Sequence, residues 1–293
     1  MPDFPAQALS FSPPRPFSIK TSTGLIDLSQ ALVMGILNLS PDSFFAGSRL
    51  NDEKELLSTA ERMLEEGAGI LDIGAMSSRP GAQEISEQEE IQILTPGIRA
   101  IRKKFPKAIL SADVFRPNVA EAALSEGADI INDIRGSNAE EKLLSVVARH
   151  KAPYMLMHSR GFFAEMHRAN TYENVAVEIA SELQQAIFRA REAGITDVIA
   201  DPGFGFSKNP EQNFALLREL RYLEILDCPI LIGISRKSMI YRALNCSPEE
   251  SLNGSTALHM AALVQGVHIL RVHDVKPAAE TIRLFSKLCL QES

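Results

Sequence analysis

The chain has 293 residues and a formal net charge of −7, and 45% of its residues are hydrophobic while 23% are charged. This composition predicts a globular protein, and the acidic balance argues against nucleic acid or an anionic membrane surface as partners. No run approaches the roughly 18 apolar residues of a membrane span. Three unclustered cysteines exclude a disulfide framework and indicate a reducing cytoplasm.

The proline-rich segment 1–17 is predicted to be a flexible N-terminal arm, because it shows no periodicity and lacks the pattern of a secretory signal. Residues 18–293 show no shift in composition, so we expect them to form one domain. Within it, eight short apolar runs are typical of strands buried on both faces. They are Leu32–Leu37, Ile70–Ile73, Ala108–Asp113, Ile130–Asn132, Tyr154–Met157, Val198–Asp201, Ile230–Ile234 and Ile269–Val272.

Helical segments separate these runs. The first should be capped by Asn51 and end at Gly67, a longer one should end at Gly194, and the last should begin at Pro277. Alternating strands and helices predict right-handed βαβ units, and about eight of them favour a closed (β/α)8 TIM barrel. A doubly wound open sheet is the competing fold, which the lack of a glycine-rich dinucleotide fingerprint disfavours.

Polar residues interrupt the apolar pattern near the C-terminal ends of the predicted strands, which all open onto one face of a barrel. They are Asn38, Asp72, Asp113, Asn132, His158, Asp201, Ser235, Arg236, Lys237, Arg271 and His273. One such residue could simply bond a loop or cap a helix, but so many equivalent positions predict a shared polar pocket. We interpret His158 differently, as a core histidine bonded to the backbone.

The pocket residues predict a ligand with several N–H donors. Asp113, Asn132 and Asp201 offer acceptors and Lys237 a charged donor, which would suit the edge of a flat heterocycle such as a guanine or a pterin. A carboxylate metal site is the alternative, but it lacks enough grouped ligands.

A second, cationic zone is predicted beside the first. Arg271 and His273, with Asn38 and Arg79, would suit phosphate oxygens and Mg²⁺. Segment 235–238 leads from a strand into a helix and could bind a carboxylate there, or its last serine could simply cap that helix. The loops 40–48 and 75–84 have the Gly, Pro and Ser content of mobile lids. In DPGFGF (201–206) the glycines allow tight turns, with Phe204 or Phe206 as a pocket wall.

Seven segments, in family order, resemble the dihydropteroate synthases, the folate-pathway enzymes that sulfonamides inhibit. They are MGILNLSPDSF (34–44), SSRPGA (77–82), INDI (131–134), LMH (156–158), DPGFGF (201–206), GISRKS (233–238) and RVHDV (271–275). The resemblance implies a (β/α)8 barrel, a homodimer, and the joining of 6-hydroxymethyl-7,8-dihydropterin pyrophosphate to p-aminobenzoate. Dihydropteroate and pyrophosphate would leave.

The resemblance also implies residue roles. The pterin would contact Asp113, Asn132, Met157, Asp201, Lys237 and Arg271, and the pyrophosphate would contact Asn38, Arg271 and His273. The p-aminobenzoate would contact Ser78, Arg79, Pro80, Phe206, Lys237 and Ser238, while Asn38 would also bind the cofactor Mg²⁺. The catalytic residues would be Asp113, Lys237, Arg271 and His273. The bond to pyrophosphate would break first or early, and the amine would attack the resulting cation without a covalent enzyme intermediate.

The chain departs from the family pattern at three positions near the site. At one of them, Ser78 stands in the second lid for the usual threonine and keeps its hydroxyl. The other two changes remove a polar group. Met76 stands where the second lid usually carries a glutamate, and Val114 stands where a threonine usually follows Asp113. These changes keep open a non-catalytic paralogue that only binds pterin or a partner protein. A pterin-dependent methyltransferase would share the barrel but not the segments 235–238 and 271–275. The apolar helical run 255–266 is expected to pack on the barrel or in a homodimer interface.

Overall fold

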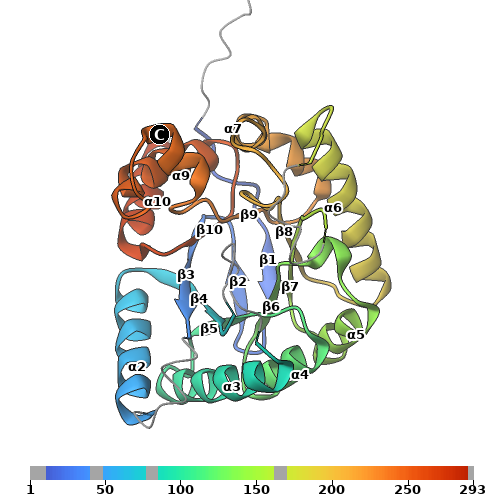
Figure 1. The fold of residues 1–293 in the computed structure, drawn as a ribbon, viewed down its shortest axis with the longest axis vertical. Helices are drawn as coiled ribbons and strands as arrows, with labels where there is room; N and C mark the ends of the chain where they lie inside the picture. Colours follow the sequence, from blue (N-terminus) through green and yellow to red (C-terminus); the bar gives the residue numbers. More distant parts are fainter. Residues whose placement is uncertain (1–10, 40–48, 77–84, 162–169, 290–293) are drawn as a thin grey trace, which may run out of the picture.

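The structure is a computed structural model that describes residues 11–39, 49–76, 85–161 and 170–289. Eight parallel strands form one sheet in the order β8-β7-β6-β5-β4-β3-β10-β9. A parallel bridge between Ala200 and Ile230 joins the two ends of this order. The sheet therefore closes into a barrel with helices around it, which confirms the predicted (β/α)8 fold (Figure 1).

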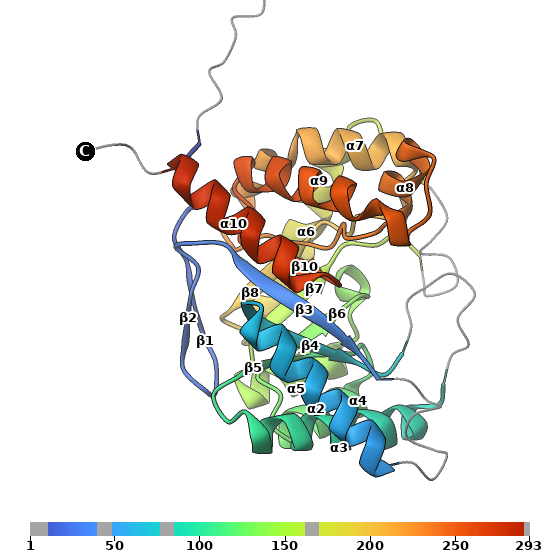
Figure 2. The ribbon, with the colours of Figure 1, turned by 90° about the vertical axis from the view of Figure 1, so that its left-hand side faces the viewer.

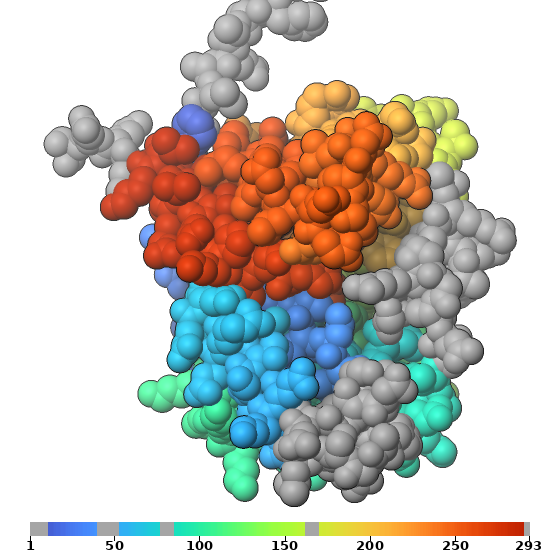
Figure 3. All heavy atoms as spheres, turned by 60° about the vertical axis from the view of Figure 1, so that its left-hand side comes forward, coloured from blue at the N-terminus to red at the C-terminus, as the bar shows by residue number. Residues whose placement is uncertain are grey.

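The barrel strands coincide with the eight apolar runs. They are β3 (Leu32–Asn38), β4 (Ala68–Gly74), β5 (Ile109–Asp113), β6 (Ile130–Asp133), β7 (Tyr154–Met157), β8 (Val198–Asp201), β9 (Leu231–Ile232) and β10 (Ile269–Val272). Their outward side chains and the apolar faces of the helices form the main core, which surrounds the barrel. Helices α2 and α10 flank β3 on the outside of the sheet (Figure 3).

The helices follow the strands in turn. The α-helices are α2 (Arg49–Glu65), α3 (Glu87–Lys104), α4 (Pro117–Ser125), α5 (Glu141–His150), α6 (Val175–Glu192), α7 (Pro210–Arg218), α8 (Ser238–Leu244), α9 (Leu252–Val264) and α10 (Val275–Cys289). The described ranges also contain the short 3-10 helices η1 (Gly136–Asn138), η2 (Leu220–Leu226) and η3 (Glu249–Ser251). No helix in the described ranges is both long and apolar enough to cross a membrane.

Two predicted helix starts are wrong by two residues. Helix α2 begins at Arg49 rather than behind a cap at Asn51, because Arg and Leu are good helix formers and extend the first turn. Helix α10 begins at Val275 rather than Pro277, since the side chain of Val275 is buried and adds an apolar contact at the start. The predicted ends are correct: Gly67 and Gly194 follow α2 and α6 with positive φ angles of 106° and 97°.

An antiparallel hairpin that the sequence did not reveal closes one end of the barrel. It consists of β1 (Ser18–Lys20) and β2 (Leu25–Asp27). Its buried residues Ile19 and Ile26, with Leu28, pack against the lowest side chains inside the barrel. Each of these strands has three residues with only the middle one buried, which is too short for a periodic signal. The hairpin lies at the end opposite to the one toward which β3 runs (Figure 2).

The described part of the predicted arm contacts the barrel. Pro14 is buried and Phe11 packs partly against the main core. Arg15 forms an ion pair of 2.7 Å with Asp227, and its carbonyl oxygen lies 2.9 Å from Nε2 of the buried His268. Residues 1–10 lie outside the described residues. The contacts at 11–17 therefore hold the chain against the barrel before the hairpin begins.

Candidate active site

The position of the polar residues follows from the two-residue period of the strands. The lowest inner layer of the barrel is apolar and holds Met34, Ile70, Ile109, Ile130, Met155, Ile199, Leu231 and Ile269. Two residues further along each strand, the side chain returns to the same face. These positions hold Ile36, Asp72, Ser111, Asn132, Met157, Asp201, Gly233 and Arg271. The predicted polar pocket therefore begins one layer above an apolar floor.

Arg271 joins Asp72 of this second layer to Asp113, which lies two residues beyond Ser111 on β5. Its Nε donates to Asp72 Oδ2 at 2.6 Å, and its Nη2 donates to Asp113 Oδ2 at 2.6 Å. Asp72 also accepts hydrogen bonds from Ser111 Oγ at 2.7 Å and Asn132 Nδ2 at 3.1 Å. Side chains from β4, β5, β6 and β10 thus meet at one buried carboxylate. Burial opposes the charge on Arg271, but Asp72 and Asp113 raise its pKa above the ordinary range.

The two carboxylates differ in what they face. Asp72 has no exposed side-chain surface, whereas the Asp113 side chain is 13% exposed beyond Arg271. Burial raises the pKa of Asp113 to about 7, and the nearby charge of Asp72 adds to this while Arg271 opposes it. Asp113 is therefore the carboxyl that a ligand can reach, and its protonation changes near neutral pH.

Lys237 reaches the same region from the loop after β9. Its Nζ donates to the carbonyl oxygen of Phe204 and lies 4.5 Å from the centroid of the Phe206 ring. Burial lowers the pKa of Lys237 to about 8, although the carboxylate of Asp201 opposes this shift. Burial likewise raises the pKa of Asp201, with Lys237 opposing. Gly205 permits the close approach, since a Cβ there would lie 3.0 Å from Lys237 Cδ.

A small apolar cluster lies beside these charges. Met157 and Phe206 are both buried in it, and the partly buried Met76 packs against it. Phe204 is instead buried in the main core. Of the two candidate wall residues, Phe206 therefore occupies the predicted position. A flat ring placed next to Met157 would meet an apolar surface on this side and polar groups on the other.

The remaining predicted site residues lie further from the apolar floor of the barrel, toward its open end. Asn38 ends β3 and is exposed, and His273 is exposed just after β10, with its Nδ1 3.4 Å from Ser235 Oγ. Ser238 is the first residue of α8, whose N-cap is Lys237, so the alternative that Ser238 simply caps the helix is wrong. Ser78, Arg79 and Pro80 lie outside the described residues.

Two neighbours of the site have structural surroundings. Arg236, with a φ of 55°, donates to both oxygens of Asp274 at 2.7 and 2.9 Å and to the carbonyl oxygens of Pro248 and Glu249. Val114 follows Asp113 on the opposite face of the strand and is buried in the main core. A threonine hydroxyl at position 114 would therefore not face the second layer.

Sequence reasoning missed the buried Lys208, named Asp72 without giving it a role, and assigned His158 to the wrong partner. His158 is buried as predicted, but its ring contacts Glu182 and Lys208 rather than the backbone. The signal for Asp72 was a lone carboxylate inside an apolar strand. Lys208 gave no signal, because its side-chain partner His158 lies 50 residues away in the chain and its other two partners are backbone carbonyl oxygens.

Comparison with known proteins agrees with this geometry. A family model described as a pterin binding enzyme matches residues 34–273. The chain is 42% identical over 261 residues to the dihydropteroate synthase of Escherichia coli (strain K12), which covers 88% of this chain and 92% of the relative. The chain belongs to the dihydropteroate synthase family. This confirms the resemblance carried by the seven sequence segments.

Two solved dihydropteroate synthases share the fold. The enzyme of Yersinia pestis, solved as a sulfonamide drug complex, is 38% identical with a TM-score of 0.85, and the match covers 92% of this chain and 98% of that one. The enzyme of Xanthomonas albilineans, solved with 4-aminobenzoic acid, is 36% identical with a TM-score of 0.82, covering 90% and 95%. Dihydropteroate synthases thus match this chain over nearly its whole length in both sequence and fold.

Proposed function

We propose that the chain is a dihydropteroate synthase that joins 6-hydroxymethyl-7,8-dihydropterin pyrophosphate to p-aminobenzoate in folate biosynthesis. The observation that carries the proposal is the polar layer around Arg271, which connects Asp72 and Asp113 at 2.6 Å each above an apolar floor. Relatives solved with a sulfonamide drug and with 4-aminobenzoic acid support the same substrates.

The pterin would lie in the second layer of the barrel. Asp113, Asn132 and Asp201 would accept its N–H groups, and Lys237 would donate to it. Met157 would pack against the ring face. Arg271 would keep Asp72 as partner through Nε while its Nη2 turns from Asp113 to the ligand, so the guanidinium stays paired throughout.

The pyrophosphate and Mg²⁺ would lie at the outer end of this layer. Among the described residues, no three His, Cys, Asp or Glu side chains gather into a metal site. Mg²⁺ fits nevertheless, because it is commonly held by one or two protein oxygens together with substrate phosphates. Asn38 would supply such an oxygen, beside Arg271 and His273, which would bind the pyrophosphate. The bound ion would neutralise part of the charge on the leaving group.

The residues support a dissociative substitution. The bond between the pterin methylene carbon and the pyrophosphate oxygen breaks, and the electron pair leaves with pyrophosphate toward Arg271 and His273. The carboxylates of Asp113 and Asp201 stabilise the cation left on the pterin. The amine of p-aminobenzoate then attacks the methylene carbon and loses a proton, so no nucleophilic side chain is required.

The p-aminobenzoate would bind above the pterin. Phe206, Lys237 and Ser238 are the described residues of this position. Phe206 offers an apolar wall, and the ammonium of Lys237, 4.5 Å from its ring, offers a positive charge for the carboxylate. The expected contacts from Ser78, Arg79 and Pro80 lie outside the described residues.

A cytoplasmic homodimer completes the proposal. Cys228, Cys246 and Cys289 are all free thiols, which suits a reducing compartment. Leu284 and Leu288 lie one turn apart on α10 and are 63% and 51% exposed, which suits an apolar contact between subunits. Sedimentation should give twice the monomer mass, and a monomer at micromolar concentration would contradict this part.

The decisive experiment measures pyrophosphate release from the pterin pyrophosphate and Mg²⁺, with and without p-aminobenzoate, and identifies dihydropteroate by mass. Product that depends on p-aminobenzoate is expected. Tight pterin binding without product would instead favour a non-catalytic paralogue. In that case Met76→Glu, which restores the usual lid carboxylate, is the first reversion to test.

A further inference from the structure

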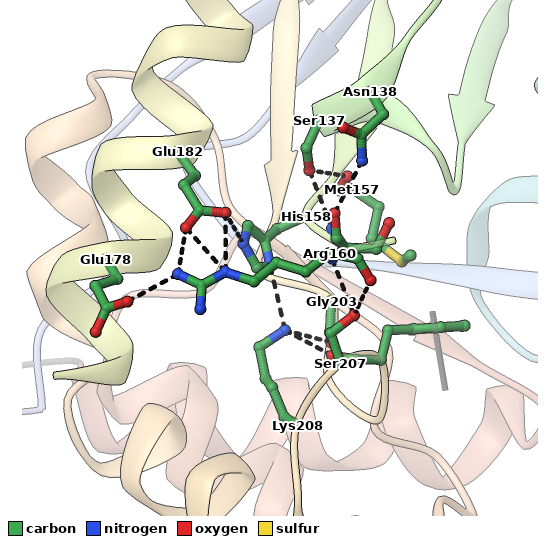
Figure 4. A network of polar contacts seen from close by, with 12 residues as sticks. Ser137, Asn138, Met157, His158, Arg160, Glu178, Glu182, Gly203, Ser207 and Lys208 are labelled. Atoms are coloured by element: carbon green, nitrogen blue, oxygen red, sulfur yellow. Dashed lines mark hydrogen bonds and ion pairs between the residues drawn. The ribbon is translucent and has the colours of Figure 1, made fainter. Parts of the chain in front are cut away.

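A buried lysine that the proposed chemistry does not use lies behind the loop that joins β8 to α7. Lys208 is 6% exposed. Its Nζ donates to the carbonyl oxygens of Gly203 and Phe206 at 2.9 Å each, and it lies 3.3 Å from Nδ1 of His158 (Figure 4). One ammonium thus holds both ends of the segment 203–206, whose Phe206 lines the site.

The surrounding groups fix the orientation of this lysine. Burial lowers the pKa of Lys208 to about 7, although the carboxylate of Asp201 opposes this shift. The ammonium form of Lys208 only donates, so Nδ1 of His158 accepts from it. The ring proton then lies on Nε2, which donates to Glu182 at 2.9 Å. Burial lowers the pKa of His158 to about 4, with the charge of Lys208 adding to the shift. The ring is therefore neutral and serves as a fixed acceptor.

Helix α6 anchors the other end of the network. Burial opposes the charge of Glu182, but hydrogen bonds from His158 and Arg160 lower its pKa to about 2. Arg160 donates through Nε to Glu182 at 3.0 Å and through Nη2 to Glu178 at 2.8 Å. Its backbone also exchanges two hydrogen bonds with the hydroxyl of Ser207, at 2.9 and 2.6 Å. The network therefore connects a rigid helix to the loop.

The opposite side of the loop faces the substrates. Lys237 donates to the carbonyl oxygen of Phe204 and contacts the Phe206 ring, and Gly203 N–H donates to Asp201 Oδ1 at 2.8 Å. The orientation of the 203–206 carbonyls therefore sets both the Phe206 ring and the Lys237 ammonium. Lys208 fixes the orientation of two of these carbonyl groups, those of Gly203 and Phe206, from the side of the loop that faces away from the substrates.

We propose that Lys208, oriented by His158 and Glu182, is a positioning residue that holds segment 203–206 against Lys237 and thereby sets the affinity for p-aminobenzoate. The proposal rests on the proposed function. It predicts an unequal effect on the two substrates. Phe206 serves the p-aminobenzoate position alone and Lys237 serves both substrates, but the pterin keeps further partners in Asp113 and Asn132, which belong to β5 and β6.

The test compares Lys208→Met, which keeps the stem and removes the donor, with Lys142→Met at an exposed position of α5. Loss of hydrogen bonds to a charged group should raise KM for p-aminobenzoate by about tenfold or more, and KM for the pterin by less than about threefold. Amide exchange of the peptide 202–208 should be faster in Lys208→Met and unchanged in Lys142→Met. Unchanged exchange with an unchanged KM for p-aminobenzoate overturns the proposal.

Glu182→Gln decides the question if Lys208→Met does not fold. It keeps the volume of the side chain and removes the charge that orients His158 and Arg160. The same direction of change is expected, with a smaller rise in KM for p-aminobenzoate and faster exchange of 202–208, and no change in either refutes the proposal. If the wild type makes no dihydropteroate, the proposed function fails, while the exchange measurement still decides whether Lys208 holds the loop.

Discussion

Replacing Asp113 by asparagine is expected to remove most activity while stabilising the fold at alkaline pH. Asparagine has the shape of a protonated carboxyl, so the variant behaves as the wild type does when Asp113 carries its proton. The pKa of Asp113 is about 7 in the folded protein, against an ordinary value of 3.8. Between these values the folded state holds a proton that the unfolded chain has lost, so wild-type stability falls as pH rises.

The size of the effect follows from this shift. The shift is about three pKa units, and each unit is worth about 1.4 kcal/mol. The free energy of unfolding of the variant should therefore exceed that of the wild type by at most about 4 kcal/mol at about pH 8. This difference in the free energy of unfolding should fall to about 2 kcal/mol at about pH 5, because Asp113 is less ionised in the unfolded wild type at that pH. Losing the carboxylate that pairs with the pterin cation should lower kcat/KM by about 100- to 1000-fold.

Urea unfolding at both pH values measures the stability, and pyrophosphate release measures the activity. Asp227→Asn is the matched control, since Asp227 is 65% exposed and distant from the barrel mouth. It should keep the wild-type activity and the wild-type pH dependence of unfolding. An Asp113→Asn variant that is less stable than the wild type at about pH 8, or that keeps its activity, would refute the reasoning.

Three further substitutions probe other parts of the molecule. Gly203→Ala should cost more than about 3 kcal/mol in urea unfolding, because φ is 68° and a Cβ would lie 2.0 Å from the carbonyl oxygen of His158; a smaller cost would show that the loop can shift. Leu28→Ala at the fully buried hairpin end should cost about 2–5 kcal/mol with activity per folded molecule unchanged, and lost activity would contradict a purely structural hairpin. Asn38→Ala should raise the Mg²⁺ concentration that gives half the maximal rate; an unchanged Mg²⁺ dependence would exclude Asn38 as a ligand.

The strands and the polar layer could be read from the sequence because a parallel barrel has a simple pattern. Strands buried on both faces appear as apolar runs, and inner residues repeat every two positions. Once the runs were placed, Asp113, Asn132, Asp201 and Arg271 had to share one end of the barrel. The same pattern gave no role to Asp72, because a carboxylate within a strand shows its partners only after the strands are assembled.

The features that sequence reasoning missed depend on contacts between distant segments. The hairpin strands are too short for any period, and their burial depends on the barrel end that they cover. Lys208 and Glu182 belong to different elements, and only the closed barrel brings them to His158. The choice between Phe204 and Phe206 as pocket wall likewise required the turn geometry at Gly203 and Gly205.

The hairpin that closes the lower end of the barrel restricts the route by which ligands enter and leave. Ile19, Ile26 and Leu28 close the floor of the barrel, and strand pairing closes its wall. The described barrel is therefore open to ligands only at the C-terminal ends of its strands. Two substrates and two products must pass through this one opening. A compound bound at the p-aminobenzoate position would block the exit of a pterin bound below it. An inhibitor of that position should therefore slow the dissociation of a bound pterin.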